Sequence, residues 1–270
     1  MTNRPIAVFD SGAGGLTVLR RAWALYPGEH FIYGADSNHF PYGSRSLSEV
    51  RTLFLRFLEF FIAQDVKAVI IACNTATAAA LEMAQEICPV PVIGVVYPGA
   101  ERAVKTTVNG RIGVLSTYAT YKSGIYRRAI GQYGQKAQVV QWPCPVLVTM
   151  AELGHTETQQ AREAVRECLN MIFPHEVDTV VLGCTHFPHM ERIFYEEVGE
   201  RATIIDPGYE TARHLPQVLG PLSSGPGGSI QFFTTGNEKD FNRISSSLWP
   251  DAIIEAKSIT WTPEGLKSRL

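Results

Sequence analysis

The sequence lacks long apolar runs and a strong charge of either sign. Nothing in its 270 residues approaches the roughly 20 apolar residues of a membrane-spanning helix. Only residues 6–9 form an apolar run near the start of the chain, too short for a secretory signal, so we expect no export and a cytoplasmic location. With 24 Lys and Arg against 26 Asp and Glu, the net charge of −2 gives no electrostatic reason to expect a nucleic-acid or membrane partner.

The sequence also lacks a disulfide framework and a paired metal-ligand motif. Its five cysteines are an odd, scattered set without a Cys-x-x-Cys pair, which indicates reduced thiols. The order Cys184, His186, His189 is the nearest approach to a metal site. No complementary Cys or His pair stands nearby, so we expect no metal and interpret His189 as structural.

A dinucleotide-binding loop is missing as well. Gly12 and Gly14 follow the first apolar run, but Thr17 stands where G-x-G-x-x-G needs its third glycine. Asp10 at the start of this loop would repel a pyrophosphate. Its carboxylate suits a substrate ammonium better, or it caps a helix. We therefore expect no nucleotide cofactor.

What the sequence does contain is an alternation of short apolar runs with helical patterns. Apolar residues recur at helical spacing in 50–61 and 161–172, and residues 223–229 have the composition of a flexible loop. This alternation predicts α/β layers with mainly parallel sheets. The expected strands are 6–9, 31–34, 68–72, 92–95, 112–115, 138–141, 179–182, 203–205 and 230–234.

A faint internal repeat suggests two similar α/β units. Residues 66–75 align with 177–186, and residues 6–11 align with 112–117 at a nearly equal separation. The alignment places Cys73 and Cys184 at the same point of the two units. The alternative is that buried parallel strands simply resemble one another.

The two matched cysteines are the strongest chemical signal. Each ends an apolar run and precedes polar residues and a helical pattern. Ligands of open α/β sheets bind beyond the carboxyl ends of strands. A helix N-terminus there lowers a thiol pKa from roughly 8.5 toward neutrality, which makes a usable base. Thiols on opposite faces of a carbon could invert a stereocentre without a cofactor. The alternative is that Cys73 and Cys184 are two buried apolar side chains.

The remaining candidates are weaker. His186 could assist Cys184. Cys168 lies on the apolar stripe of an expected helix and is interpreted as a core residue, and Cys88 and Cys144 have no polar neighbours that suggest chemistry. Residues 40–44 predict a turn with an exposed Tyr42, and local sequence places Glu152 at the surface.

Six motifs together resemble those of glutamate racemases in the aspartate/glutamate racemase superfamily. The resemblance spans essentially the whole chain and is carried by residues 9–17, 41–43, 72–78, 123–126, 182–188 and 234–236. Residues 35–39, Tyr97 and residues 206–207 depart from the usual pattern. These departures leave substrate affinity, domain packing and regulation open.

The resemblance implies a fold and a cofactor requirement. It implies an α/β fold with two similar, pseudo-twofold related domains, each a mainly parallel sheet flanked by helices. The first domain would be residues 1–97 and 208–270, the second residues 98–207, with the active site in the cleft between them. Members work without pyridoxal phosphate or metal, and we expect a homodimer or a monomer.

The resemblance also implies residue roles. Cys73 would abstract the α-proton of D-glutamate and Cys184 that of L-glutamate. Asp10 and His186 would assist the thiols, and Glu152 would support His186. D-glutamate would supply peptidoglycan synthesis, and so cell-wall biogenesis and cell shape. The implied substrate-binding residues are Asp10, Ser11, Tyr42, Gly43, Asn74, Thr75, Thr117, Thr120, Thr185 and His186.

Four rival functions can be compared with this one. An aspartate or hydantoin racemase differs in pocket shape, which the sequence does not give. A malonate-type decarboxylase needs only one of the two cysteines. A non-catalytic amino-acid-binding protein would bind its ligand without exchange at Cα, and a thiol redox or metal protein lacks its motifs.

Overall fold

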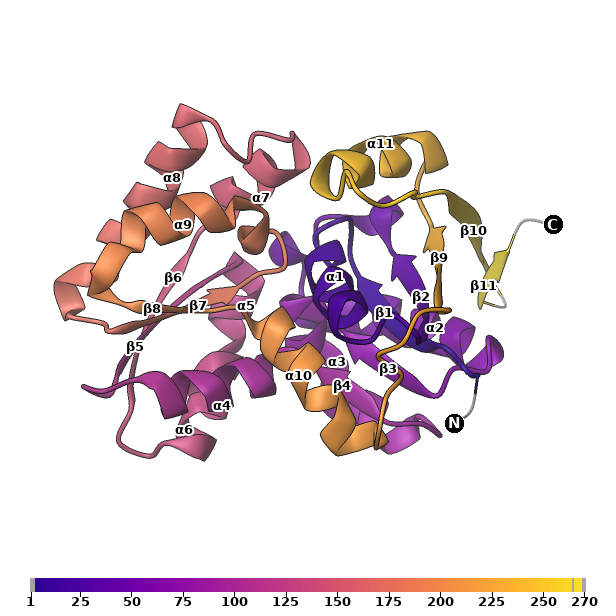
Figure 1. Ribbon diagram of the computed structural model, residues 1–270, viewed down its shortest axis with the longest axis horizontal. Helices are drawn as coiled ribbons and strands as arrows, with labels where there is room; N and C mark the ends of the chain where they lie inside the picture. The colour runs from indigo at the N-terminus through magenta and orange to yellow at the C-terminus, as the bar shows by residue number, and fades with distance from the viewer. Residues whose placement is uncertain (1–2, 264, 269–270) are drawn as a thin grey trace.

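The chain folds into two lobes, each built on its own sheet (Figure 1). The computed structural model describes residues 3–263 and 265–268. One sheet has seven strands in the order β11-β10-β9-β2-β1-β3-β4, and the other has four in the order β6-β5-β7-β8. All pairs are parallel except the antiparallel pair β10 and β11.

The elements have the following bounds. The strands are β1 (Ile6–Asp10), β2 (His30–Ala35), β3 (Ala68–Ile71), β4 (Val92–Gly94), β5 (Arg111–Ser116), β6 (Gln138–Pro143), β7 (Thr179–Gly183), β8 (Thr203–Ile205), β9 (Ser229–Thr234), β10 (Ala256–Thr262) and β11 (Gly265–Ser268). The α-helices are α1 (Leu16–Leu25), α2 (Leu47–Ala63), α3 (Asn74–Ile87), α4 (Val96–Thr106), α5 (Tyr118–Ser123), α6 (Ile125–Tyr133), α7 (Pro145–Glu152), α8 (Gln159–Asn170), α9 (Glu191–Val198), α10 (Pro207–Leu219) and α11 (Glu238–Leu248).

The strand order repeats between the lobes. The run β2-β1-β3-β4 of the larger sheet has the same order as β6-β5-β7-β8 of the smaller one. In this match β1 corresponds to β5 and β3 to β7, which are the segments that the sequence repeat aligned. Cys73 and Cys184 therefore follow corresponding strands of two similarly ordered sheets.

The central strands are buried on both faces, which explains their unbroken apolar sequence. In β1, Ile6 and Val8 pack into one core cluster, whereas Ala7 and Phe9 pack into another on the opposite face. This is the alternation that a pleated strand imposes. Burial of both faces holds the carboxyl ends of the strands in fixed positions.

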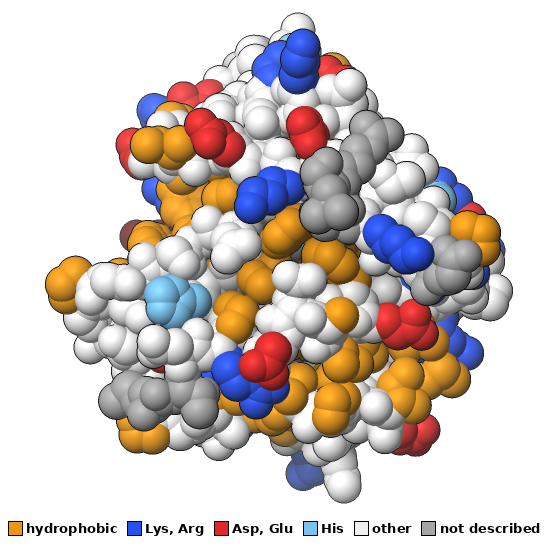
Figure 2. All heavy atoms as spheres, turned by 90° about the vertical axis from the view of Figure 1, so that its right-hand side faces the viewer, with side chains coloured by type: hydrophobic (Ala, Val, Ile, Leu, Met, Phe, Trp, Pro, Cys, Tyr) orange, Lys and Arg blue, Asp and Glu red, His pale blue; other side chains and the backbone are white. Residues whose placement is uncertain are grey.

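The structure confirms the nine strands expected from the sequence and adds two. β10 and β11 at the sheet edge were not expected. Helix α2 covers the first segment with helical spacing, whereas α8 ends at Asn170 and leaves the last two residues of 161–172 outside the helix. The predicted loop ends where β9 begins at Ser229. In the described part of the chain, no helix is long and apolar enough to span a membrane. On the face seen in Figure 2, basic and acidic side chains are interspersed rather than gathered by sign.

Candidate active site

A cavity of about 510 Å³ lies where side chains from both lobes meet, beyond the ends of the strands. Asp10 and Thr120, fully buried, lie directly behind its wall, and each hydrogen-bonds a wall residue. The structure thus brings all the sequence-predicted site residues to one place. Those that line the cavity are Ser11, Tyr42, Gly43, Cys73, Asn74, Thr75, Thr117, Glu152, Cys184, Thr185 and His186.

Cys73 occupies the N-cap position of α3. Its Sγ accepts a hydrogen bond from the backbone N–H of Ala76 at 3.4 Å, and its thiol donates to the Ser11 Oγ at 3.9 Å. Burial, together with the nearby Asp10 carboxylate, raises the pKa of this thiol, and the Ala76 N–H only partly offsets that rise. The expectation of a lowered pKa is therefore wrong for Cys73, because it considered the helix terminus and left out burial.

Asp10 is the last residue of β1, and its side chain is fully buried behind the cavity wall. Its two carboxylate oxygens accept hydrogen bonds from the Gly12 N–H at 3.0 Å and from the Thr185 hydroxyl at 3.1 Å. Burial raises the pKa of Asp10 to about 6, against the opposing influence of His186 and these donors. This carboxyl group can therefore gain or lose a proton near neutral pH.

Cys184 faces a histidine rather than a carboxylate. Its Sγ lies 3.8 Å from the His186 Nδ1, and the His186 Nε2 lies 2.6 Å from the Glu152 Oε1. Burial alone would lower the pKa of His186, but Cys184 and Glu152 outweigh burial and raise that pKa well above its ordinary value. Glu152, expected at the surface on local sequence, has a side chain only 18% exposed because it turns inward to His186.

The glycines after β1 allow this packing. A Cβ on Gly14 would lie 2.5 Å from the His186 ring, and a Cβ on Gly15 would lie 2.5 Å from the Asp10 Cβ. Both distances are shorter than side chains tolerate. The glycine-rich loop therefore lets the two lobes approach closely at the site, a use of glycine that differs from phosphate binding.

Three threonine hydroxyls join the lobes. The Thr75 Oγ1 lies 3.0 Å from both the Thr117 Oγ1 and the Thr120 Oγ1, which are 3.0 Å from each other. Thr117 also caps α5. A Cβ on Gly43 would lie 2.8 Å from the Thr117 Cβ, so glycine is needed for the Pro-Tyr-Gly turn to reach the threonines.

Tyr42 is buried, so the expectation of an exposed tyrosine is wrong. Its hydroxyl donates to the Asp36 Oδ2 at 2.6 Å, and Asp36 also accepts hydrogen bonds from Thr235 at 2.6 Å and Trp261 at 3.2 Å. The tyrosine ring lies 6.1 Å from that of Phe9. Two of these partners come from far along the chain, so local sequence could not reveal the burial.

The apolar part of the cavity was not predicted. Phe40, Tyr118, Pro145, Val148 and Leu153 line it beside the polar groups. The apolar sequence that precedes Glu152 was the available signal, because α7 presents part of it to the cavity. These side chains limit water around the two thiols.

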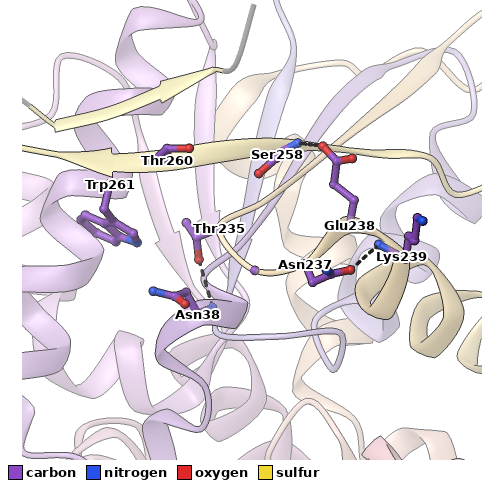
Figure 3. Close-up of a pocket in the computed structure, with 9 residues that line it drawn as sticks. Asn38, Thr235, Asn237, Glu238, Lys239, Ser258, Thr260 and Trp261 are labelled. Atoms are coloured by element: carbon purple, nitrogen blue, oxygen red, sulfur yellow. Dashed lines mark hydrogen bonds between the residues drawn. The ribbon is translucent and has the colours of Figure 1, made fainter.

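A second cavity of about 670 Å³ lies beside the carboxyl end of β9 (Figure 3). Asn38, Thr235, Lys239 and Trp261 are among its lining residues, and it contains neither thiol. Within residues 3–263 and 265–268, no three His, Cys, Asp or Glu side chains are arranged to hold a metal ion. The smaller cavity is therefore the one equipped for proton transfer.

Comparison with known proteins decides the family. The Asp/Glu/hydantoin racemase family matches residues 17–215. The glutamate racemase of Symbiobacterium thermophilum is 47% identical over 263 residues, which cover 96% of this chain and 95% of that protein. The chain belongs to the Asp/Glu/hydantoin racemase family.

Solved structures of family members match both lobes of this racemase-family chain. Glutamate racemase isoform RacE1 from Bacillus anthracis superposes with a TM-score of 0.90 and 37% identity, covering 94% of this chain and 97% of that one. The Francisella tularensis glutamate racemase, solved with D-glutamate, gives a TM-score of 0.87 and 29% identity, covering 96% and 98%. The α/β fold with helix-flanked parallel sheets is the fold of these enzymes.

Proposed function

We propose that this protein interconverts L-glutamate and D-glutamate by proton transfer through two thiols. The observation that carries the proposal is that Cys73 and Cys184 line one cavity, each on a different lobe and each with its own polar partner. The glutamate racemases that match nearly the whole chain support glutamate as the substrate. D-glutamate would then supply peptidoglycan synthesis.

The reaction needs one thiolate and one thiol on opposite faces of Cα. With D-glutamate, the Cys73 thiolate takes the α-proton, and the electron pair of the broken C–H bond delocalises into the substrate carboxylate. The Cys184 thiol then donates its proton to the other face and gives L-glutamate. The reverse reaction exchanges these roles, so both thiols act as general acid and general base in turn.

Each thiol needs a group that can hold its proton between turnovers. His186 lies beside Cys184, and Glu152 stabilises the imidazolium form of the ring. Asp10, whose pKa burial raises to about 6, is the titratable group near Cys73. The active site therefore uses an imidazole on one side and a carboxyl group on the other.

Hydroxyl and amide groups bind the substrate carboxylates. Ser11, Asn74, Thr75, Thr117 and Thr185 offer such groups to the cavity. Tyr42 and Gly43 line the same part of the cavity, and the buried Asp10 and Thr120 hold the lining residues in place. The substrate is a small molecule.

The domain division at residues 97/98 and 207/208 remains a proposal. The strands of residues 98–207 form the four-stranded sheet, and those outside this range form the seven-stranded one, which supports the division. A cytoplasmic location and a homodimeric or monomeric state are likewise proposals.

The test is exchange and inversion in heavy water. Purified protein with metal chelated and no added cofactor is incubated with L-glutamate, while proton NMR follows the α-proton and a chiral assay follows the D-isomer. L-aspartate runs in parallel. Exchange with racemisation of glutamate supports the proposal. Reaction of aspartate alone overturns the substrate, and binding without exchange of either overturns the enzymatic function.

A further inference from the structure

A buried tyrosine connects the two cysteine-bearing strand ends. Tyr126 belongs to α6 of the smaller lobe and is fully buried. Its hydroxyl donates a hydrogen bond of 2.7 Å to the Asn74 Oδ1, across to the first residue of α3 in the larger lobe. Asn74 directly follows Cys73, so this bond reaches the end of the helix that carries the first thiol.

The same tyrosine ring also lies against β7, the strand that ends directly before the second thiol. A Cβ on Gly183 would lie 2.9 Å from the Tyr126 Cε2, so the ring packs on the backbone of the residue before Cys184. One side chain thus contacts the segments that hold both thiols. Gly124, with φ of +67°, turns the chain between α5 and α6 and places Tyr126 there.

The direction of the hydrogen bond has a consequence for Asn74. Its side-chain amide has one carbonyl acceptor and one NH₂ donor. Tyr126 occupies the carbonyl, whereas the Nδ2 has no hydrogen-bond partner among residues 3–263 and 265–268, although Asn74 lines the cavity. The amide is therefore held with its donor available to a carboxylate in the cavity.

We propose that Tyr126 is a positioning residue, which orients the Asn74 amide toward a substrate carboxylate and fixes the position of the Cys73 segment relative to the Cys184 segment. This inference rests on the proposed function, since it assigns Asn74 a substrate carboxylate. Tyr126 itself does not line the cavity wall described above, so its effect on the reaction passes through Asn74.

Tyr126→Phe tests the inference because it removes the hydroxyl and keeps the ring. We expect KM for both glutamate isomers to rise about tenfold, as for loss of one buried hydrogen bond, with a smaller change in kcat. D-glutamate should also raise the melting temperature less than in the wild type. Tyr97→Phe is the matched control, because Tyr97 is half-buried outside this cavity and its hydroxyl makes no hydrogen bond within the described residues. An unchanged KM in Tyr126→Phe overturns the inference.

A double-mutant cycle with Asn74→Ala distinguishes positioning from a general structural role. If Tyr126 acts through Asn74, the double variant has the same KM as Asn74→Ala alone. Fully additive effects overturn the inference. Wild-type protein in the same assays separates the two proposals: a wild type that does not racemise glutamate refutes the proposed function, whereas an active wild type matched by Tyr126→Phe refutes only the role of Tyr126.

Discussion

The two thiols stand at corresponding places in two similarly ordered sheets, yet their surroundings differ. Cys73 hydrogen-bonds Ser11 and lies near the Asp10 carboxyl group. Cys184 lies against His186, which is in turn held by Glu152. Repetition of the fold explains where the thiols are, but it does not explain how each is protonated. That depends on the residues that follow each strand.

The two thiols also differ in the titratable group that lies near each of them. The pKa of His186 is raised, which favours its imidazolium form, and burial raises the pKa of Asp10 to about 6. A two-base reaction needs one protonated and one deprotonated thiol at the start of each turnover. An imidazole near one thiol and a carboxyl group near the other suit that requirement, because the two thiols can then be in different protonation states at the same pH.

Removing either thiol should have the largest effect and should reveal which isomer of glutamate each thiol deprotonates. Cys73→Ala and Cys184→Ala are each expected to lower racemisation by about 10³-fold, the contribution of a general acid–base group. Cys73→Ala should still exchange the α-proton of L-glutamate, and Cys184→Ala that of D-glutamate. Proton NMR in heavy water on each isomer measures this. If both variants exchange the same isomer, the assignment of thiols to faces is wrong.

Replacing the Asp10 carboxyl group should stabilise the fold at neutral pH. Its folded-state pKa is raised from 3.8 to about 6, so the folded state binds this proton more tightly than the unfolded state does. The charged carboxylate therefore destabilises the fold above about pH 6, and this penalty disappears as the pH falls below 3.8. Above pH 6, the free energy of unfolding of Asp10→Asn should be about 2–3 kcal/mol higher than that of the wild type, since each pKa unit is about 1.4 kcal/mol.

Urea unfolding at several pH values between 4 and 8 measures the difference in free energy of unfolding between Asp10→Asn and the wild type. This gap should be widest at neutral pH and should close toward pH 4. The variant should also lose racemase activity. A gap that stays constant over this range would show that the Asp10 carboxyl group is not the titrating group.

Glu152→Gln should weaken the Cys184 side alone. Loss of the carboxylate beside the His186 Nε2 removes support for the imidazolium, with an expected tenfold fall of about 1.4 kcal/mol in kcat/KM. Because the isomers have equal free energy, kcat/KM must fall equally in both directions. The asymmetry should appear in the primary deuterium isotope effect, which should rise for α-deuterated L-glutamate and not for the D-isomer. Equal isotope effects would contradict the pairing of Glu152 with Cys184.

The sequence predicted the interior of this molecule better than its edges. Strands such as β1 and β7 are buried on both faces and read as continuous apolar runs. β10 was missed because it mixes polar residues with apolar ones, with Lys257, Ser258 and Thr260 among them. A strand near the edge of a sheet needs less apolar sequence, so its pattern resembles that of a loop.

Within the site, residue identities were predictable, but their environments were not. Two cysteines at matching points were visible in the sequence, whereas the burial of Tyr42 depends on an Asp36 network that includes Trp261. The Cys73 pKa was misjudged for a related reason. Motifs identify which groups are present, but desolvation depends on chain segments that the motif does not contain.

The smallest expected effect comes from a cysteine outside the cavity. Cys168, on α8, is buried in the core of the smaller lobe among residues such as Val165 and Leu182. Cys168→Ala should lower the free energy of unfolding by about 1 kcal/mol, since it removes one buried sulfur atom. It should leave kcat and KM for both glutamate isomers unchanged, because this thiol reaches no substrate. Urea unfolding and the chiral assay measure the two quantities. A fall in kcat comparable to that of Cys73→Ala would mean that position within the repeated fold does not decide which thiols react.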